Sequence, residues 1–546
     1  KYLRMRDRIL RALPQWSAIL SLGACYTLFD APFWDALIQS SLGINVNGPY
    51  LQMLVTSAEI GNLFIFVPAL LADRYPPALV TIGGAALVII GYSVLGFGMV
   101  TIADSSIIEV VATVFTYSWG AGWIYAAAFV TIASNIAAEA RGHALGTGLA
   151  AFYFASSWWT EVTEYCCIGE TTFEKSAWRH MPIAGTAILC SAGLYIIGRN
   201  GSSTTKCSLK DAGLDKIWIG YMVLLGLHTY QWIVTGGEGS RDLSKFAWGD
   251  IPFSFGVLYF CGVSFFGTIY ARNLMKYGIE FCAALHRNNR SGELKEMIVD
   301  KDISGSRHGM HSKEKMCKDM DIPWLSYGNA SYKALCAIVA VNIGVVQTVA
   351  YNWETIKLHY GGHGTDVAQI YNISRVLGCL VMGKILDNGV DRSKTLCMLT
   401  GILTVTQLVL AADWNTTWAT TSNGSFFLPY PFEEIPLGVC AFTAGGLYTL
   451  IPVMELEWYG TSGIGRIHGT TLLCAIGGQT FFYSILGNIV SFDILLGTMT
   501  VACAVSSCLA YWIMAKQGTT CTNTETDGTT DEDDVIYDES VSLIVT

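Results

Sequence analysis

Residues 78–100 read ALVTIGGAALVIIGYSVLGFGMV, a run that contains no charged side chain. A helix that crosses the hydrocarbon core of a bilayer needs about 20 mostly apolar residues, so this run predicts a transmembrane helix. Of the 546 residues, 52% are hydrophobic and only 14% are charged, whereas an ordinary soluble domain has about 25% charged residues. The composition therefore excludes a soluble globule and a disordered chain. The net charge of −10 gives no electrostatic reason to expect nucleic-acid binding.

Similar apolar runs on both sides of this one predict an all-α, polytopic membrane protein. Six spans are expected near 15–38, 51–72, 78–100, 106–135, 142–163 and 181–198, two near 216–235 and 252–275, and six near 332–351, 364–386, 395–412, 435–456, 466–488 and 491–514. The predicted segments are a cytoplasmic tail (1–13), a six-helix bundle (14–198), two additional helices (199–275), a cytoplasmic loop (276–330), a second six-helix bundle (331–515) and an acidic, disordered cytoplasmic tail (516–546). The alternative to two inserted helices is a total of 12 rather than 14.

The basic residues predict the orientation of these spans. With the N-terminus in the cytoplasm, 27 of the 33 Lys and Arg residues fall in inner segments and five in outer ones, as the positive-inside rule requires. The sequons at Asn415 and Asn423 then share one outer loop, where they could be glycosylated. No cleavable signal peptide is expected, because the basic N-terminal segment leads directly into a full-length span.

Two inner turns repeat between the bundles and predict a conformational latch. The sequence Ala69-Leu-Leu-Ala-Asp73-Arg74 in the first bundle corresponds to Gly383-Lys-Ile-Leu-Asp387 in the second, which is followed by Asp391-Arg392. Each fifth helix starts with an Arg beside a Gly, and we expect this Arg to pair with the acid of the other bundle's turn. The latch residues are Asp73, Arg74, Arg141, Asp387, Arg392, Glu455 and Arg466. The alternative is that Arg74, Arg141 and Arg466 only anchor helices in the headgroup layer.

This repeated pattern resembles the major facilitator superfamily, and within it the nodulin-like facilitators, which are relatives of monocarboxylate porters. Three segments carry the resemblance: Asp73-Arg-Tyr-Pro-Pro77 leading to Ile90-Gly91-Tyr92; Asn135 followed by Glu139-Ala-Arg-Gly142 and Gly146; and Glu455-Leu-Glu457-Trp-Tyr-Gly460 followed by Gly469. The resemblance implies two pseudo-symmetric six-helix bundles that rock alternately about a substrate site at the midplane. The chain departs from the superfamily's inner-loop motif at Ala69 and Pro76, where that motif has Gly.

Arg375 is the candidate substrate-binding residue, because it lies in the middle of an expected span. A charge at that depth costs about 3 kcal/mol or more and indicates function by default. A guanidinium can clamp a carboxylate with two parallel hydrogen bonds. In the monocarboxylate porters the matching helix carries an Arg that meets the substrate, so the resemblance implies the same role here. The alternative is a structural pair with an acid on a neighbouring helix.

Two acids inside spans, Asp30 and Glu59, are candidates for proton coupling or for countering Arg375, since a buried carboxyl group can take up a proton near neutral pH. The monocarboxylate porters place a Lys on the first helix and this chain has none there, which weakens the transfer of their proton-coupled mechanism. Further polar and aromatic residues at span centres could line the cavity or simply fill packing space: Tyr26, Trp119, Asn342, Gln347, Tyr371, Tyr448 and Gln479.

No cofactor or metal is expected, because the 16 cysteines show no metal-ligand spacing and His308 and His311 are too few for a site. The segment from Glu539 to Leu543 and Ile544 resembles an acidic dileucine signal, which implies a clathrin adaptor as partner and a plasma, endolysosomal or vacuolar membrane. We predict a secondary transporter, not an enzyme, that moves a small organic anion (a monocarboxylate or pantothenate-like acid), with protons as coupling ion. The alternatives are a carrier of a neutral or zwitterionic solute (an amino acid or nucleoside), with Arg375 permanently paired to Asp30 or Glu59, and a receptor that binds solute without moving it.

Overall fold

The computed structural model describes residues 2–25, 49–100, 107–166, 214–234, 330–352, 365–419 and 435–526, together with short helical pieces at 188–196 and 355–356. These residues are helical apart from short turns between the helices, and they contain no extended strand. Helix α6 (Ile107–Asn135) is the centre of the first bundle. The helices packed against it are α1 (Tyr2–Cys25), α3 (Pro49–Leu63), α4 (Phe66–Arg74) and α5 (Pro77–Val100), and α7 (Arg141–Cys166) follows after a short 3-10 turn at Ala138–Ala140.

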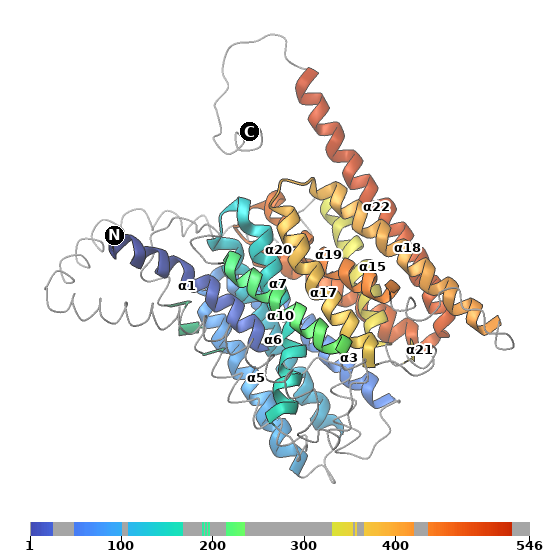
Figure 1. Ribbon diagram of the computed structural model, residues 1–546, viewed down its shortest axis with the longest axis horizontal. Helices are drawn as coiled ribbons and strands as arrows, with labels where there is room; N and C mark the ends of the chain where they lie inside the picture. Colours follow the sequence, from blue (N-terminus) through green and yellow to red (C-terminus); the bar gives the residue numbers. More distant parts are fainter. Residues whose placement is uncertain are drawn as a thin grey trace, which may run out of the picture.

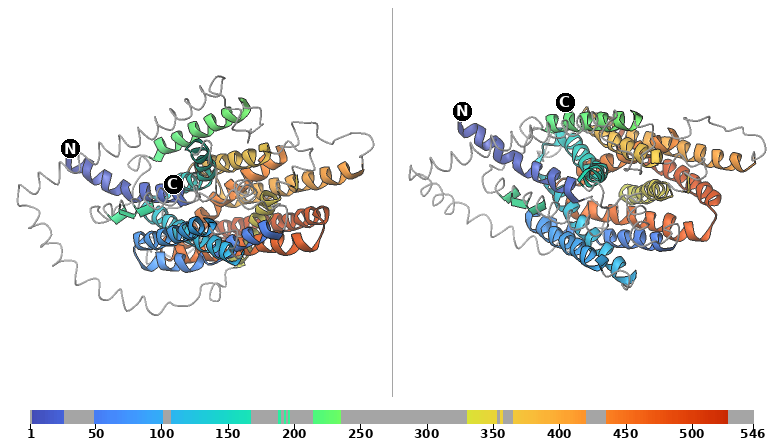
Figure 2. Two further views of the ribbon diagram at one scale, coloured as in Figure 1. Left: turned by 90° about the horizontal axis from the view of Figure 1, so that it is seen from below. Right: turned by 60° about the horizontal axis from the view of Figure 1, so that its bottom comes forward.

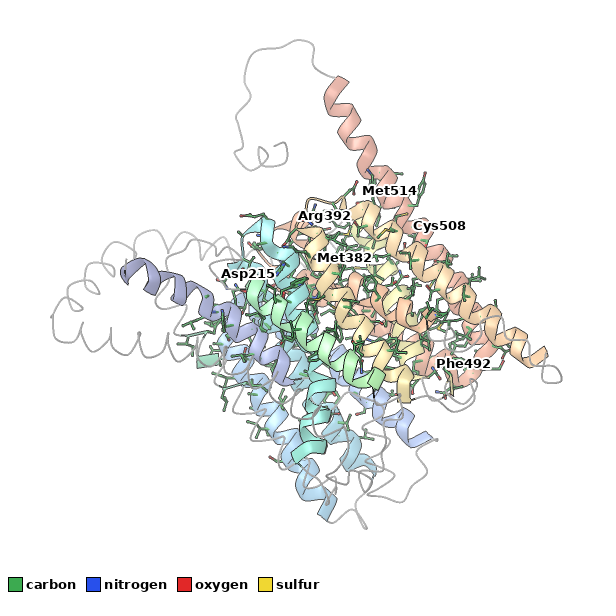
Figure 3. All side chains as sticks on the ribbon, viewed as in Figure 1. Asp215, Met382, Arg392, Phe492, Cys508 and Met514 are labelled. Carbon is green, nitrogen blue, oxygen red and sulfur yellow. The ribbon has the colours of Figure 1, made fainter. Side chains whose placement is uncertain are left out.

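The second bundle lies beside the first and is formed by the C-terminal third of the chain (Figures 1 and 2). It contains α15 (Ala330–Tyr351), α17 (Thr365–Leu386), α18 (Arg392–Ala419), α19 (Ile435–Tyr459) and α20 (Ile464–Gln479), then a π-helical segment η4 (Thr480–Leu486), α21 (Gly487–Ile489) and α22 (Phe492–Thr526). Helix α17 packs on α19, α18 on α22, and α15 on both α20 and α22. Arg392 and Met514 lie at one end of the α18–α22 pair and Phe492 at the other, so these two helices are antiparallel (Figure 3).

Six helical stretches in the described part of the chain are long and apolar enough to cross a membrane: Thr56–Arg74, Ala330–Tyr351, Arg392–Ala412, Ile435–Tyr459, Ile464–Ile489 and Phe492–Lys516. The uncharged run at residues 78–100 lies in helix α5, which begins at Pro77. The expected span near 252–275 lies outside the described residues, and only short pieces of the span near 181–198 are described.

Three expected boundaries differ from the structure. Helix α1 begins at Tyr2 rather than near residue 15, so most of the expected N-terminal tail is helical. The second expected span is two helices, because the α-helix is interrupted at Phe64 and Ile65. Pro68 explains this break, since proline has no N–H to donate to the carbonyl group four residues earlier. Helix α22 continues to Thr526, so the first residues of the expected disordered tail prolong the last helix.

Helix α10 (Leu214–Val234), one of the two additional predicted spans, packs against α7 of the first bundle and α17 of the second. It crosses in front of both helices in Figure 1 and lies on the outside of the molecule in Figure 2. The indole N–H of Trp218 donates to the carbonyl oxygen of Leu380 at 3.1 Å, and its ring lies 5.8 Å from that of His143. The extra helix therefore covers the junction between the bundles.

Candidate functional site

The two bundles meet along two seams that are related by the internal repeat. In the α7–α17 seam, a Cβ added to Gly142 would lie 2.9 Å from the carbonyl oxygen of Gly383. In the α4–α20 seam, a Cβ added to Gly465 would lie 2.6 Å from the carbonyl oxygen of Ala69. Both seams thus depend on glycine at the start of the fifth helix of a bundle, where any side chain would push the two backbones apart.

The acid of each repeated turn binds the start of a helix in the opposite bundle. Asp73 accepts the backbone N–H groups of Gly465 and Arg466 at 2.8 and 2.7 Å. Asp387 accepts those of Gly142 and His143 at 2.9 and 3.0 Å. The first backbone N–H groups of a helix have no partner within the helix and carry the positive end of its dipole, so a carboxylate is favoured there.

These contacts correct the predicted chemistry of the latch. We expected guanidinium groups to pair with the acids. The hydrogen-bond donors to the two acids are backbone amides, whereas Arg466 and Arg74 act on Asp73 through their charge. Arg392 instead forms an ion pair with Glu457 of its own bundle at 2.8 Å. Arg141 is buried and Arg74 is exposed. The arginines thus stand beside the contacts between turn and helix, and the carboxylates make them.

Burial raises the pKa of Asp387 to about 6, although the two backbone hydrogen bonds and the nearby Lys384 and Arg392 act in the opposite direction. Above that pH the carboxylate is ionised and binds the helix start as an anion. Between about pH 4 and 6, Asp387 in this contact is protonated to a greater extent than an aspartate in water is.

Glu455 and His468 form a buried pair beside the α4–α20 seam. Their Oε2 and Nδ1 atoms are 2.7 Å apart, and both side chains lie in the second bundle. The imidazole ring stacks on Phe129 of the first bundle at 4.0 Å between ring centres and reaches the hydroxyl of Tyr125 at 3.4 Å. Glu455 therefore touches the opposite bundle only through His468 in the described contacts, and not through a turn arginine.

Arg375 lies in the α7–α17 seam and is 4% exposed. Its guanidinium carbon lies 4.3 Å from the ring centre of Tyr153 on α7 and 5.2 Å from that of Tyr371 on its own helix. One N–H group donates to the side-chain oxygen of Asn372 at 3.0 Å. Arg375 precedes Asp387 by 12 positions on one helix, so it lies about 18 Å from that turn. The cation is thus held between tyrosine rings of both bundles.

Tyr448 and Gln347 extend this arrangement, which we call the arginine cluster (Arg375, Asn372, Tyr371, Tyr153, Tyr448 and Gln347). The rings of Tyr153 and Tyr448 are 5.3 Å apart. The side-chain amide of Gln347 on α15 donates to the Tyr448 hydroxyl at 2.9 Å. The Tyr371 hydroxyl donates to the carbonyl oxygen of Val346 at 2.9 Å. The structure thus brings together four of the predicted binding residues: Arg375, Tyr371, Gln347 and Tyr448.

Glu59 lies in a second polar cluster, which we call the glutamate cluster (Glu59, Gln479, Thr480, Ser484 and Tyr351). Glu59 is 1% exposed on α3 and accepts the side-chain amide of Gln479 at 2.7 Å. The Ser484 and Thr480 hydroxyls donate to its other oxygen at 3.2 and 3.5 Å. Both hydroxyls belong to the π-helical segment η4, and π-helical turns often occur at functional sites. Thus the partners that hold Glu59 come from the opposite bundle.

The remaining predicted site residues lie elsewhere. The side-chain amide of Asn342 donates to Ser506 on α22 at 2.5 Å and packs inside the second bundle. Trp119 contacts Phe64, Phe115 and Trp123 in the first bundle. Asn415 falls in the last turns of α18. Tyr26, Asp30, Asn423, Glu539, Leu543 and Ile544 lie outside the described residues.

Two pairings were missed by the sequence reasoning. Asn372 was not predicted as a partner of Arg375, although its position three residues before Arg375 places both side chains on one helix face. The pair of Glu455 and His468 had a signal in the sequence, since both residues flank the turn between α19 and α20. Among the described residues, no group of three or more His, Cys, Asp or Glu side chains could hold a metal ion.

Comparison with solved structures identifies the fold as that of the major facilitator superfamily. The chain is similar to the proton:xylose symporter XylE bound to 6-bromo-6-deoxy-D-glucose, with a TM-score of 0.50, 11% identity, and coverage of 93% of this chain and 94% of that one. It is similar to the transporter FucP in the outward conformation, with a TM-score of 0.52, 10% identity, and coverage of 92% and 98%. A third similar structure is a bacterial homologue of the iron transporter ferroportin in the outward-facing state with soaked iron, with a TM-score of 0.51, 10% identity, and coverage of 92% and 99%.

No protein-family model matches the chain, and no curated protein matches it. At 10–11% identity the similar structures establish the fold of this chain and not its substrate.

Proposed function

We propose that this protein is a secondary transporter that moves a small organic anion across a membrane by alternating access. The observation that carries the proposal is Arg375, buried at 4% exposure in the seam between two bundles of the major facilitator fold. A buried guanidinium is retained against a large desolvation cost, and binding an anionic substrate is a reason to retain it. The Tyr153 and Tyr371 rings contact the guanidinium, and one of its N–H groups donates to Asn372. A carboxylate would bind through N–H groups in the guanidinium plane.

The described contacts weigh against one form of the alternative, a carrier of a neutral or zwitterionic solute. That alternative needs Arg375 to be paired permanently with Asp30 or Glu59. The described partners of Glu59 come from α20 and η4, whereas Arg375 contacts Tyr153 on α7, and Tyr371 and Asn372 on α17. Asp30 lies outside the described residues.

Alternating access is supported by the repeated contacts of Asp73 and Asp387, which close the same end of both seams. The density of basic residues predicts that this end is cytoplasmic, and the proposal therefore places both clusters on the outer side of a closed inner gate. We further propose protons as the coupling ion, with Glu59 as the group that takes them up.

A thermal-shift screen with small monocarboxylates tests the binding part of the proposal. A ligand that binds only the folded state raises the melting temperature by mass action. We expect at least one monocarboxylate to stabilise the wild type and Lys394→Gln, an exposed control position, but not Arg375→Gln. An equal stabilisation of Arg375→Gln would contradict the assignment of the anion site.

The cellular setting is proposed from sequence alone. We propose membership of the nodulin-like branch, N- and C-termini in the cytoplasm, glycosylation at Asn415 and Asn423, and a clathrin adaptor as partner of the C-terminal segment. Digestion with a glycosidase and a shift in gel mobility that is lost in the double Asn→Gln variant would test the glycosylation.

A further inference from the structure

Helix α15 connects the arginine cluster with the glutamate cluster. Gln347 and Tyr351 are four residues apart on this helix, so they lie one above the other on one face. The amide of Gln347 donates to Tyr448 at 2.9 Å. The hydroxyl of Tyr351 accepts the amide of Gln479 at 3.1 Å, and the same nitrogen of Gln479 donates to Glu59 at 2.7 Å. One turn of α15 thus bridges the two clusters.

The donors and acceptors in this path respond to the charge of Glu59. The Gln479 nitrogen has two N–H groups, and the described contacts direct one to Glu59 and the other to Tyr351. An ionised carboxylate attracts the first N–H group roughly twice as strongly as a neutral acceptor does. Protonation of Glu59 removes this attraction, so the position of the Gln479 amide and the hydrogen bond of Tyr351 change with it.

At its other end the path reaches the side chains around the anion site. The Tyr448 oxygen accepts from Gln347, and the Tyr448 hydroxyl also hydrogen-bonds with Tyr153, whose ring centre lies 4.3 Å from the guanidinium carbon of Arg375. A carboxylate held by Arg375 would compete for the hydroxyl hydrogens of this tyrosine pair, because it is a stronger acceptor than a neutral oxygen. Binding of an anion therefore acts through Tyr448 on Gln347, at the opposite end of the same helical turn from Tyr351.

Glu59 is the acidic residue of the glutamate cluster, and its described hydrogen-bond partners are neutral. From α20 and η4 it faces the neutral side chains of Gln479, Thr480 and Ser484. From α15 the titratable group nearest to it is Tyr351, whose ring lies 5.0 Å from that of Tyr483. Helix α6 contacts α3 near Glu59 through Val111, Phe115 and Ser118, none of which titrates.

We propose that Gln347 and Tyr351 are positioning residues that couple the protonation of Glu59 to anion binding at Arg375. The inference rests on the proposed function, because it assumes a transported anion and a coupling proton. It adds the path of residues between the anion site and the proton site. It also assigns to Tyr351 a positioning role that neither its sequence position nor the fold indicates. Since coupling is reciprocal, protonation at one end strengthens anion binding at the other by the same factor by which the anion favours protonation.

The test separates solute exchange from proton-driven accumulation in proteoliposomes. The variants are Tyr351→Phe, Gln347→Met as a second break of the same path, and Tyr221→Phe as a matched control on α10, where the ring contacts Phe154 and lies outside both clusters. We expect Tyr351→Phe to keep counterflow of a labelled monocarboxylate. Gln347 belongs to the arginine cluster, so Gln347→Met is judged by its accumulation relative to its own counterflow. Under an inward proton gradient both variants should accumulate, relative to counterflow, about fivefold less solute than the wild type, which corresponds to the loss of one hydrogen bond. Tyr221→Phe should match the wild type in both assays.

A binding measurement at two pH values gives a readout that does not depend on transport. Wild-type affinity for the monocarboxylate should increase as the pH falls, and this dependence should be flattened in Tyr351→Phe. Wild-type accumulation and pH dependence in both path variants would overturn the inference and leave the proposed function standing. Absence of counterflow in the wild type would overturn the proposed function itself, and the inference with it.

Discussion

Replacing Asp387 by alanine should open the end of the molecule at which the repeated turns meet. The carboxylate accepts two backbone N–H groups of α7, at 2.9 and 3.0 Å, and no other part of its side chain crosses the seam in the described contacts. A hydrogen bond to a charged group contributes about 1.5–3 kcal/mol. Asp387 is only partly buried and its desolvation opposes the contact, so we count only about 1 kcal/mol for each of the two bonds. The closed arrangement should lose about 2 kcal/mol, a shift of roughly thirtyfold in its equilibrium with the open one.

Asp391 provides a matched control for this substitution. It also accepts two backbone N–H groups at a helix start, those of Ser393 and Lys394 at 2.9 and 3.1 Å, but that helix belongs to its own bundle. Asp391→Ala should therefore destabilise α18 without opening the seam.

The assay is a distance distribution between two genetically encoded spin labels at the exposed positions Glu139 and Val390, one in each bundle. Asp387→Ala should shift population to longer distances, whereas Asp391→Ala should keep the wild-type distribution. Equal distance distributions in Asp387→Ala and Asp391→Ala would refute the reasoning. The hydrogen bonds between the bundles would then stabilise the closed arrangement no more than a helix cap within one bundle does.

Three further predictions concern the same seam. Burial raises the pKa of Asp387 to about 6. The fraction of molecules in the closed arrangement should therefore be highest below pH ~4, fall between about pH 4 and 6, and level off above. Asp387→Asn should lack this pH-dependent contribution in the same distance measurement. Trp218→Phe removes a hydrogen bond that ties α10 to α17, so amide hydrogen exchange in α10 should become about fivefold faster; unchanged exchange would mean that the bond is unimportant. Gly383→Ala would place a Cβ 2.6 Å from the Gly142 oxygen and should lower the melting temperature by several degrees, whereas Gly401→Ala, with nothing within 4 Å, should not.

The sequence predicted the helical architecture well because a bilayer imposes a simple rule on composition. An apolar run such as 78–100 has to be a helix in lipid, where every backbone polar group needs an internal partner. The interruption between α3 and α4 was not predicted, although Pro68 carried a signal for it. The π-helical segment after Gln479 had no signal, because its geometry depends on how residues 480–486 pack against Glu59 and Tyr351.

The sequence predicted which residues belong to the candidate site better than it predicted the contacts that they make. Arg375 and Glu59 stood out because charge is rare in apolar spans, and the repeated turns of Asp73 and Asp387 stood out by their symmetry. Which atoms bind these acids was not predictable, since side-chain spacing along the chain does not reveal that a glycine at a helix start exposes its backbone N–H group to another bundle. The same limit hid the bridge through α15, which exists only once three helices are packed together.

Counterflow of a labelled small monocarboxylate in proteoliposomes tests the central proposal most directly. Wild-type protein preloaded with unlabelled solute should concentrate the label transiently above the external level, and Arg375→Gln should abolish this overshoot while Lys394→Gln keeps it. A wild type that binds the monocarboxylate but never shows an overshoot would contradict transport and favour a receptor that senses the solute without moving it.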